Sequence, residues 1–132
     1  MITVNIYKQS NYPVSAKKVK DAVVKTFLDN GLQSEAEASV AIVSHSKMIE
    51  YALDYLKEEV GTAAMHPVLS FPTAELKGPF QFPPDKTLHL GEIVVSYQKA
   101  VEYAKKENRL VDDVVVDLAC HGALHLIGIH HD

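Results

Sequence analysis

The segment from Val114 to about Ile127 constrains the fold most, because apolar residues occupy most positions of a predicted helix. Asp112 or Asp113 can cap its first turn. A helix that is apolar around most of its circumference belongs in the interior of a protein. The residues that carry this pattern are Val114, Val115, Val116, Leu118, Leu124 and Leu126. We therefore expect the helix to be central to the hydrophobic core.

Four segments upstream of this helix have the alternation or the β-branched content of strands. The expected strands cover residues 2 to 7, 39 to 44, 68 to 71 and 88 to 95. The strand at 68 to 71 ends at Pro72, which opens a proline-rich segment reaching Lys86. Proline removes backbone donors, so this segment is expected to be a loop.

Three further helices are expected between the strands. The first is capped by Ser15 and ended by Gly31, and the third is capped by Ser96. The second covers Lys47 to Glu59, with Met48, Tyr51, Ala52 and Tyr55 on its inner side. Helices and strands alternate without a strict βαβ rhythm, which predicts an α+β fold with a small mixed sheet. The length of 132 residues fits a single domain covering residues 1–132.

Composition favours a soluble, cytoplasmic protein. The chain has one cysteine, no pattern of a signal peptide, and no apolar run long enough to span a membrane. Its net charge is −4, which argues mildly against a general nucleic-acid binder but leaves room for a local basic groove. Arg109 is the one arginine, so phosphate contacts would fall mostly to lysines.

The last twelve residues, HGALHLIGIHHD, contain a metal-binding pattern. His121 and His125 are four residues apart, so on a helix they share one face. Gly128 permits a left-handed turn after them, and His131 can then return toward the pair. Three imidazoles on one side of a cation leave a position for water, the usual arrangement of catalytic zinc. Nickel, copper and cobalt also accept such ligands.

The spacing HxxxHxxGxxH also occurs in metzincin proteases, which carry a glutamate directly after the first histidine as general base. Here that position is Gly122. A metalloprotease-like hydrolase therefore has the ligands it needs but lacks its usual base.

Three segments make the chain similar to a known family. HGALHLIGIHHD resembles the HGxLHLxGYDH signature of the YbeY family, the metal-dependent endoribonucleases of rRNA maturation. VLSFP (residues 68 to 72) is similar to the family's TDVLSFP element, and LGEIVVS (residues 90 to 96) to its LGDIVIS strand. The resemblance implies a mixed sheet of about four strands, flanked by four or more helices, with the metal at the C-terminal helix.

The resemblance implies that His121, His125 and His131 are the metal ligands and the catalytic centre, with one Zn²⁺ per chain. Other positions depart from the family. Leu56 stands where the family carries an arginine that contacts RNA phosphate, and Ala52 where it carries asparagine. His130 and Ile129 replace the aspartate and tyrosine of the signature.

The implied activity is cleavage of single-stranded RNA, in maturation of the 16S rRNA 3′ end and in ribosome quality control, with rRNA and ribosomal components as partners. A metal-bound water with a pKa lowered to about 7 would attack the phosphodiester. The expected cleft lies between the C-terminal helix and the loop from Pro72 to Lys86, with Lys57, Lys77 and Lys86 as candidate phosphate contacts. One alternative is a ribosome-associated metal-binding factor with weak or no nuclease activity, and the other is the protease-like hydrolase.

Several other residues have two interpretations. Asp117, one turn before His121, could orient that imidazole or be a solvated carboxylate. His66 could be a fourth ligand or a substrate contact, although a loop histidine is more often neither. Glu92 could act as acid or base near the metal or have a sheet-edge or salt-bridge role. Cys120 is interpreted as buried filler, because it points about 100° away from His121 around the helix. His45 and His89 are expected to be structural or exposed.

Overall fold

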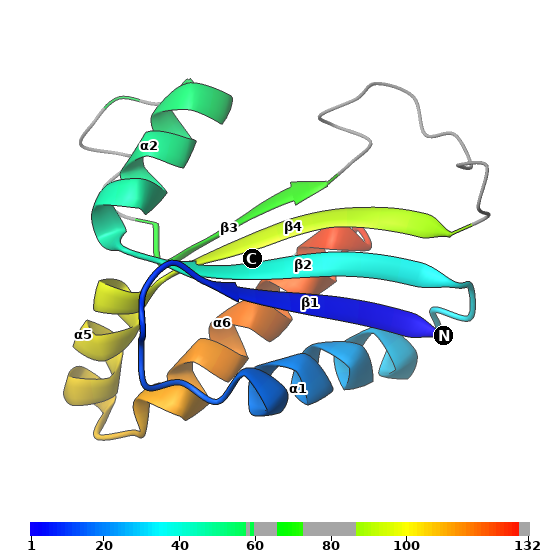
Figure 1. Cartoon of the computed structure of the whole chain (residues 1–132), viewed down its shortest axis with the longest axis horizontal. Helices are drawn as coiled ribbons and strands as arrows, with labels where there is room; N and C mark the ends of the chain where they lie inside the picture. The colour runs from blue at the N-terminus through cyan, green and yellow to red at the C-terminus, as the bar shows by residue number, and fades with distance from the viewer. Residues whose placement is uncertain (58, 60–65, 73–86, 130–132) are drawn as a thin grey trace.

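The computed structural model describes residues 1–57, 59, 66–72 and 87–129. Its sheet has four strands in the order β1-β2-β4-β3 (Figure 1). The strands are β1 (Ile2–Lys8), β2 (Ala36–Val43), β3 (Val68–Pro72) and β4 (Leu88–Ser96). β1, β2 and β4 run parallel, and β3 pairs antiparallel with β4 at the edge of the sheet. The mixed sheet and its flanking helices confirm the predicted α+β fold.

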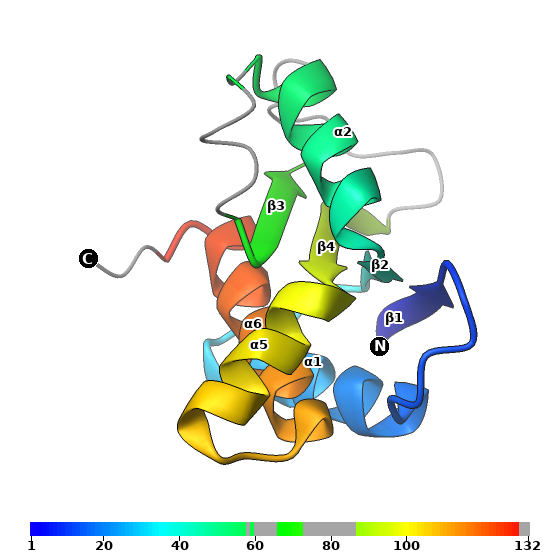
Figure 2. The ribbon, with the colours of Figure 1, turned by 90° about the vertical axis from the view of Figure 1, so that its left-hand side faces the viewer.

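Helices cover the two faces of the sheet unequally. α1 (Ala16–Asp29), α5 (Tyr97–Glu107) and α6 (Val111–Leu126) pack together on one side, and α2 (His45–Tyr55) is the one helix of the described residues on the other (Figures 1 and 2). Side chains alternate along each strand, so Ile93 and Val95 enter the core beneath α6 while Val94 faces α2.

α6 is the central helix of the larger layer, as the sequence predicts. It packs against α1, α5, β3 and β4. Its residues Val114, Val115, Ala119, Ala123 and Leu126 are all buried in the core that joins these elements. The helix on which the histidines lie is therefore held from several sides.

Local capping explains most of the helix boundaries. The hydroxyl oxygens of Ser15, Ser44 and Ser96 accept hydrogen bonds from backbone N–H groups in the first turns of α1, α2 and α5. After α1 the chain turns at Gly31, with φ +88°, a conformation that suits glycine. The caps at Ser15 and Ser96 and the turn at Gly31 confirm the predictions from sequence.

The start of β2, both ends of α2, and the start and cap of α6 differ from the prediction. β2 begins at Ala36 rather than at residue 39, because its first residues pair with β1 from Ile2 onward. α2 begins at His45 and ends at Tyr55, short of residue 59, since Lys57 adopts the left-handed conformation with φ +57°. α6 begins at Val111 without a side-chain cap.

Asp112 and Asp113 lie in the first turn of α6 instead of capping it. There a negative charge interacts favourably with the helix dipole. The carboxylate of Asp113 also accepts a hydrogen bond of 2.7 Å from the Lys18 ammonium group of α1. That ion pair lowers the pKa of Asp113 and raises the pKa of Lys18.

No helix in the described ranges has the length and apolar composition needed to cross a membrane. The expected loop from Pro72 to Lys86 can be assessed only at Pro72, the last residue of β3, because residues 73–86 lie outside the described part.

Candidate metal and substrate site

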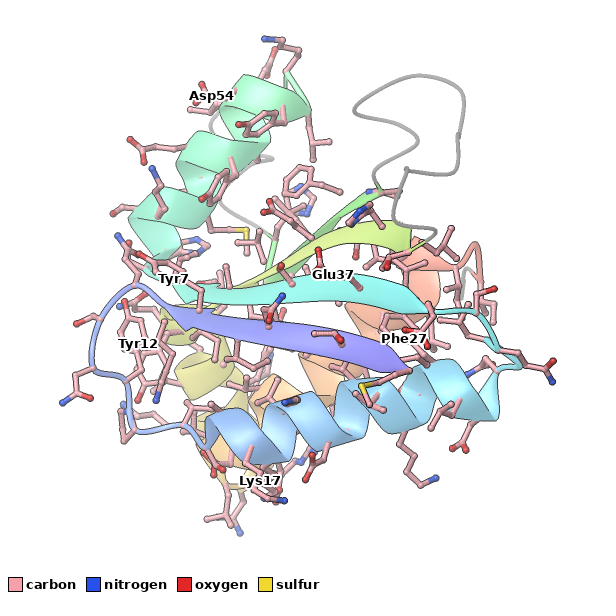
Figure 3. The ribbon with its side chains drawn as sticks, turned by 45° about the vertical axis from the view of Figure 1, so that its right-hand side comes forward. Tyr7, Tyr12, Lys17, Phe27, Glu37 and Asp54 are labelled. Atoms are coloured by element: carbon pink, nitrogen blue, oxygen red, sulfur yellow. The ribbon has the colours of Figure 1, made fainter. Side chains whose placement is uncertain are left out.

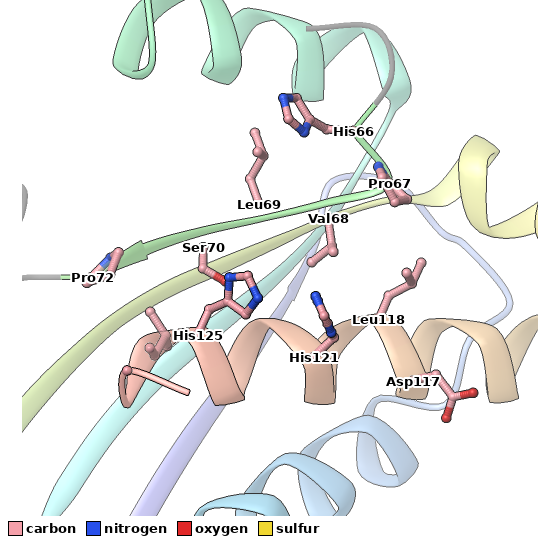
Figure 4. A pocket seen from close by; sticks show the side chains of 12 residues that line it. His66, Pro67, Val68, Leu69, Ser70, Pro72, Asp117, Leu118, His121 and His125 are labelled. Atoms are coloured by element: carbon pink, nitrogen blue, oxygen red, sulfur yellow. The ribbon is translucent and has the colours of Figure 1, made fainter. Parts of the chain in front are cut away.

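His121 and His125 lie side by side on one face of α6, as their spacing predicts. Their ring centroids are 4.6 Å apart and the ring planes are tilted by 47°. His121 is exposed, whereas His125 is half-buried and its Nε2 atom is shielded from solvent. Both rings point from α6 toward β3 (Figure 4). The pair thus joins a solvent-facing imidazole to one held against the protein.

The two imidazoles line a cleft of about 840 Å³ between α6 and the edge strand β3. His66 and Pro67, which precede β3, form another part of its wall, and Figure 4 shows His66 on the α2 side of the strand. The remaining described lining residues are Val68, Leu69, Ser70, Pro72, Asp117, Leu118, Leu126 and Gly128. Since His66 lines the same cleft as the pair, a role in substrate contact remains open to it.

Gly122 brings α6 close to the sheet next to the histidine pair. A Cβ atom at this position would lie 2.7 Å from Cγ2 of Ile93 and 3.0 Å from Oγ of Ser70. The Ser70 hydroxyl donates a hydrogen bond of 2.9 Å to the carbonyl oxygen of Gly122. A glutamate at this position would therefore displace the side chain of Ile93 or the helix itself. Packing thus disfavours the carboxylate that the protease motif has here.

The third predicted ligand, His131, lies outside the described residues. Gly128 has φ +85°, so the chain does make the left-handed turn that the prediction required directly after α6. Within the described ranges there is no group of three or more His, Cys, Asp or Glu side chains arranged to hold a metal. The convergence of all three imidazoles stays a prediction.

The donor set that is described suits a divalent transition metal. Two imidazoles one helical turn apart, with access from a cleft, match the partial ligand set of many zinc sites. Imidazole nitrogen is also a common ligand for nickel and copper. His121 and His125 therefore fit the implied group, and His131 would complete the set.

Asp117 is engaged with Arg109. The Arg109 guanidinium group donates a hydrogen bond to the Asp117 carboxylate, and this contact is the main reason why the pKa of Arg109 is raised. In Figure 4 the Asp117 carboxylate points away from the His121 ring. Of the two interpretations of Asp117, the surface carboxylate agrees with the structure, here as one half of an ion pair.

Glu92 lies on the opposite face of the sheet from the histidine pair. It alternates with Ile93, whose side chain enters the core beneath α6, so Glu92 shares its face with Val94 and α2. A direct acid or base role beside His121 is therefore wrong for Glu92. The structural interpretation of this residue remains.

The other histidines and the cysteine make structural contacts. Nδ1 of His45 lies 2.9 Å from the hydroxyl oxygen of buried Ser96, and Nδ1 of His89 lies 3.3 Å from a carboxylate oxygen of Glu37. Burial raises the pKa of the Cys120 thiol, which keeps it protonated at neutral pH. Cys120 is only half-buried, so its interpretation as buried filler holds in part.

Of the three lysines predicted to contact phosphate, only Lys57 lies in the described part of the chain. Lys77 and Lys86 lie outside the described residues. Lys57 is exposed just beyond α2 and is not among the described residues that line the cleft. The described lining contains no lysine or arginine. Lysine contacts with substrate therefore stay predictions.

Sequence reasoning missed the part that β3 plays in the cleft. Val68 and Ser70 line it from the α6 side, and Leu69 reaches it from the α2 side. The alternation within VLSFP already places Val68 and Ser70 on one face of the strand. This alternation identifies Val68 and Ser70 as cleft residues once β3 is known to lie at the sheet edge beside α6.

The sequence of this chain is similar to known proteins over nearly its whole length. The family model described as "Endoribonuclease YbeY" matches residues 4–132. The Endoribonuclease YbeY of Clostridioides difficile is 30% identical over 116 residues, which are 88% of this chain and 72% of that protein. The one from Caldicellulosiruptor saccharolyticus is 29% identical over 131 residues, covering 94% of this chain and 80% of its own length. The one from Deinococcus radiodurans is 35% identical over 97 residues, covering 74% and 57%. With a match over nearly its whole length, the chain belongs to the YbeY family of endoribonucleases.

Proposed function

We propose that this protein is a zinc-dependent endoribonuclease that cuts single-stranded RNA in the cleft between α6 and β3. We further propose that it acts on rRNA in the cytoplasm, in maturation of the 16S 3′ end and in ribosome quality control. The observation that carries the proposal is the pair of imidazoles, 4.6 Å apart, on a buried helix that lines an open cleft.

His121, His125 and His131 would hold the metal. When bound, a zinc ion supplies a Lewis acid that polarises a phosphoryl oxygen and acidifies water in its ligand shell. That chemistry suits this cleft, because its described lining offers no cationic side chain to neutralise charge on a phosphate. The lining also offers no carboxylate except Asp117, which is paired with Arg109.

The chain's own residues keep the pair in place and limit access. The buried residues of α6 fix the helix, and the Ser70 hydroxyl ties β3 to it beside His125. Apolar side chains of Val68, Leu118 and Leu126 line the cleft near the rings and reduce the water around a bound phosphodiester. A rigid ligand pair needs little reorganisation when substrate binds.

The alternative is a ribosome-associated metal-binding factor with weak or no nuclease activity. It is favoured by Leu56, which is 42% exposed at the end of α2 where the family carries a cationic residue. The two functions differ in whether RNA is cut, while metal binding is common to both.

Cleavage of a labelled single-stranded RNA by untagged protein tests the proposal. We expect cleavage by the wild type, loss of cleavage on chelation, and recovery on adding zinc. His125→Ala should reduce the rate to background. His89→Ala is the matched control, because His89 lies away from the cleft beside Glu37, and it should cut like the wild type. Cleavage that survives both chelation and His125→Ala would contradict the proposed function.

A further inference from the structure

Two aromatic rings of α2, Tyr51 and Tyr55, form a row that rests on Phe71 of β3. The Tyr51 and Tyr55 rings are 6.0 Å apart with an interplanar angle of 26°, and Tyr55 lies 5.6 Å from the ring of Phe71 on β3. The sequence predicted both tyrosines on the inner side of α2, and the contacts of both rings with Phe71 agree. Tyr55 is nevertheless 57% exposed, while Met48 and Ala52 of the same helix are fully buried.

The two ends of this row differ. At one end the Lys47 ammonium group lies 5.3 Å from the centre of the Tyr51 ring, so that ring already has a neighbour on each side. At the other end, Tyr55 packs on buried Phe71 and keeps more than half of its surface open. An aromatic ring that is supported by neighbouring rings and exposed over more than half of its surface can stack with another flat ring.

This aromatic row is continuous with the histidine cleft. Phe71 lies between Ser70 and Pro72, both of which line the cleft. Leu69 lines the cleft as well and is buried in the cluster beneath α2, and Figure 4 shows it pointing from β3 toward that helix. The cleft thus extends from the histidines around the edge strand to the side of the sheet on which the tyrosines lie.

We infer that Tyr55, supported by Tyr51 and Phe71, is a stacking platform for an unpaired base of the RNA strand whose backbone enters the histidine cleft. The inference rests on the proposed function and names the feature of the substrate that this surface selects. A base must be unpaired to stack on a protein ring, so the platform favours single strands over duplexes.

Charge separates this binding mode from ordinary phosphate binding. Lys47 is paired with Glu50 at 3.4 Å, and exposed Asp54 and Lys57 on either side of Tyr55 in the sequence carry opposite charges, so the described platform has no excess of positive charge. Stacking on Tyr55 is therefore the part of RNA binding that salt should not screen.

The test measures binding of short fluorescent oligoribonucleotides in the His125→Ala background, where the RNA is not cut. We expect Tyr55→Ala to weaken binding of single-stranded oligo(A) by about 5- to 100-fold, the range found when stacking aromatics are removed. The effect on oligo(U) should be smaller because pyrimidines stack less strongly. The ratio of the dissociation constants of the Tyr55→Ala variant and its His125→Ala parent should be the same at low and high salt.

Two control variants separate stacking from other effects. Tyr55→Phe keeps the ring and should bind like the parent. Tyr7→Ala removes a tyrosine that is 61% exposed on β1, at the opposite edge of the sheet, and should also have no effect. Melting temperatures of all variants confirm that each is folded.

Equal binding of oligo(A) by Tyr55→Ala and its parent would overturn the inference, as would an equal loss for duplex RNA. This outcome is distinct from failure of the proposed function. If the wild type binds single strands through Tyr55 but never cuts them, the stacking inference is supported and the proposed nuclease function is contradicted. If the Tyr55→Ala variant cuts RNA with an unchanged KM, the nuclease function is supported and the stacking inference is contradicted.

Discussion

The two faces of the sheet are built differently. On one face, α1, α5 and α6 share a continuous core that includes Phe27 and Val115, both fully buried. On the other, α2 rests on a small separate cluster around Met48, Leu69, Phe71 and Val94, while β1, at the far edge of the sheet from β3, leaves polar side chains and Tyr7 open to solvent (Figure 3). The larger core fixes the histidine helix, and the smaller one holds a helix whose Tyr55 packs on Phe71 and stays more than half exposed.

Under the proposed function, metal binding belongs to one side of the edge strand and binding of an RNA base to the other. Groups that hold a metal must keep their geometry, so they belong on the well-packed face. Groups that bind varied RNA sequences need only an open ring or charge, and a lightly anchored helix can present these. β3 contributes to both, with Ser70 facing α6 and Phe71 facing α2.

The largest effect is expected where the well-packed face is tightest. Gly122→Glu would restore the carboxylate of the protease motif, but its Cβ atom alone collides with Ile93. Overpacking costs about 1–3 kcal/mol, and a buried unpaired carboxylate adds to that cost. We expect little folded protein, as measured by urea unfolding. Gly128→Ala is the matched control, because nothing lies within 4 Å and only its φ of +85° is strained; it should cost about 1–2 kcal/mol. A stable, peptide-cutting Gly122→Glu variant would contradict this account of the packing.

A medium effect should separate the two cores directly. Phe27→Ala removes a large side chain from the main core and should cost about 3–5 kcal/mol, whereas Met48→Ala should fall near the low end of about 2–5 kcal/mol. Amide hydrogen exchange should show that Met48→Ala accelerates exchange in α2 while α6 stays protected. Equal acceleration in α2 and α6 would mean that the two faces unfold together and that the comparison is wrong.

The smallest effect concerns the link between the faces. Ser70→Ala removes the hydrogen bond to the Gly122 carbonyl oxygen and should cost about 0.5–1.5 kcal/mol in free energy of unfolding. Because this bond lies beside His125, we also expect weaker metal binding, measured by titration with zinc. Ser46→Ala, in the first turn of α2 and exposed to solvent, is the control and should change neither quantity. Unchanged zinc affinity in Ser70→Ala would remove β3 from the support of the ligand pair.

Sequence patterns predicted the fold well where local chemistry determines structure. Ser15 and Ser96 cap helices because their hydroxyls bond to first-turn N–H groups, and the alternation from Ile2 onward places β1 correctly. The patterns failed where tertiary contacts decide. β2 is longer than its β-branched segment because β1 supplies partners for Ala36 and the residues after it.

The sequence placed two of the three predicted ligands on one face of α6, while His131 lies outside the described residues, and it did not predict the surroundings of the cleft. The spacing of His121 and His125 was enough to place both rings on one face of α6. Glu92 was misplaced as a possible acid or base, since the face of a strand depends on register, and Gly91 in its unusual conformation lies beside the irregularity near residue 38. Tyr55 lies on the predicted side of α2 but stays exposed, because helical periodicity cannot show how narrow the cluster beneath this helix is.

The central claim is that His121, His125 and His131 together hold one metal ion. Elemental analysis of untagged protein tests it most directly, comparing the wild type with His131→Ala and with His89→Ala. We predict about one zinc-class ion per chain in the wild type and in His89→Ala, and almost none in His131→Ala. A full complement of metal in His131→Ala would contradict the three-histidine site.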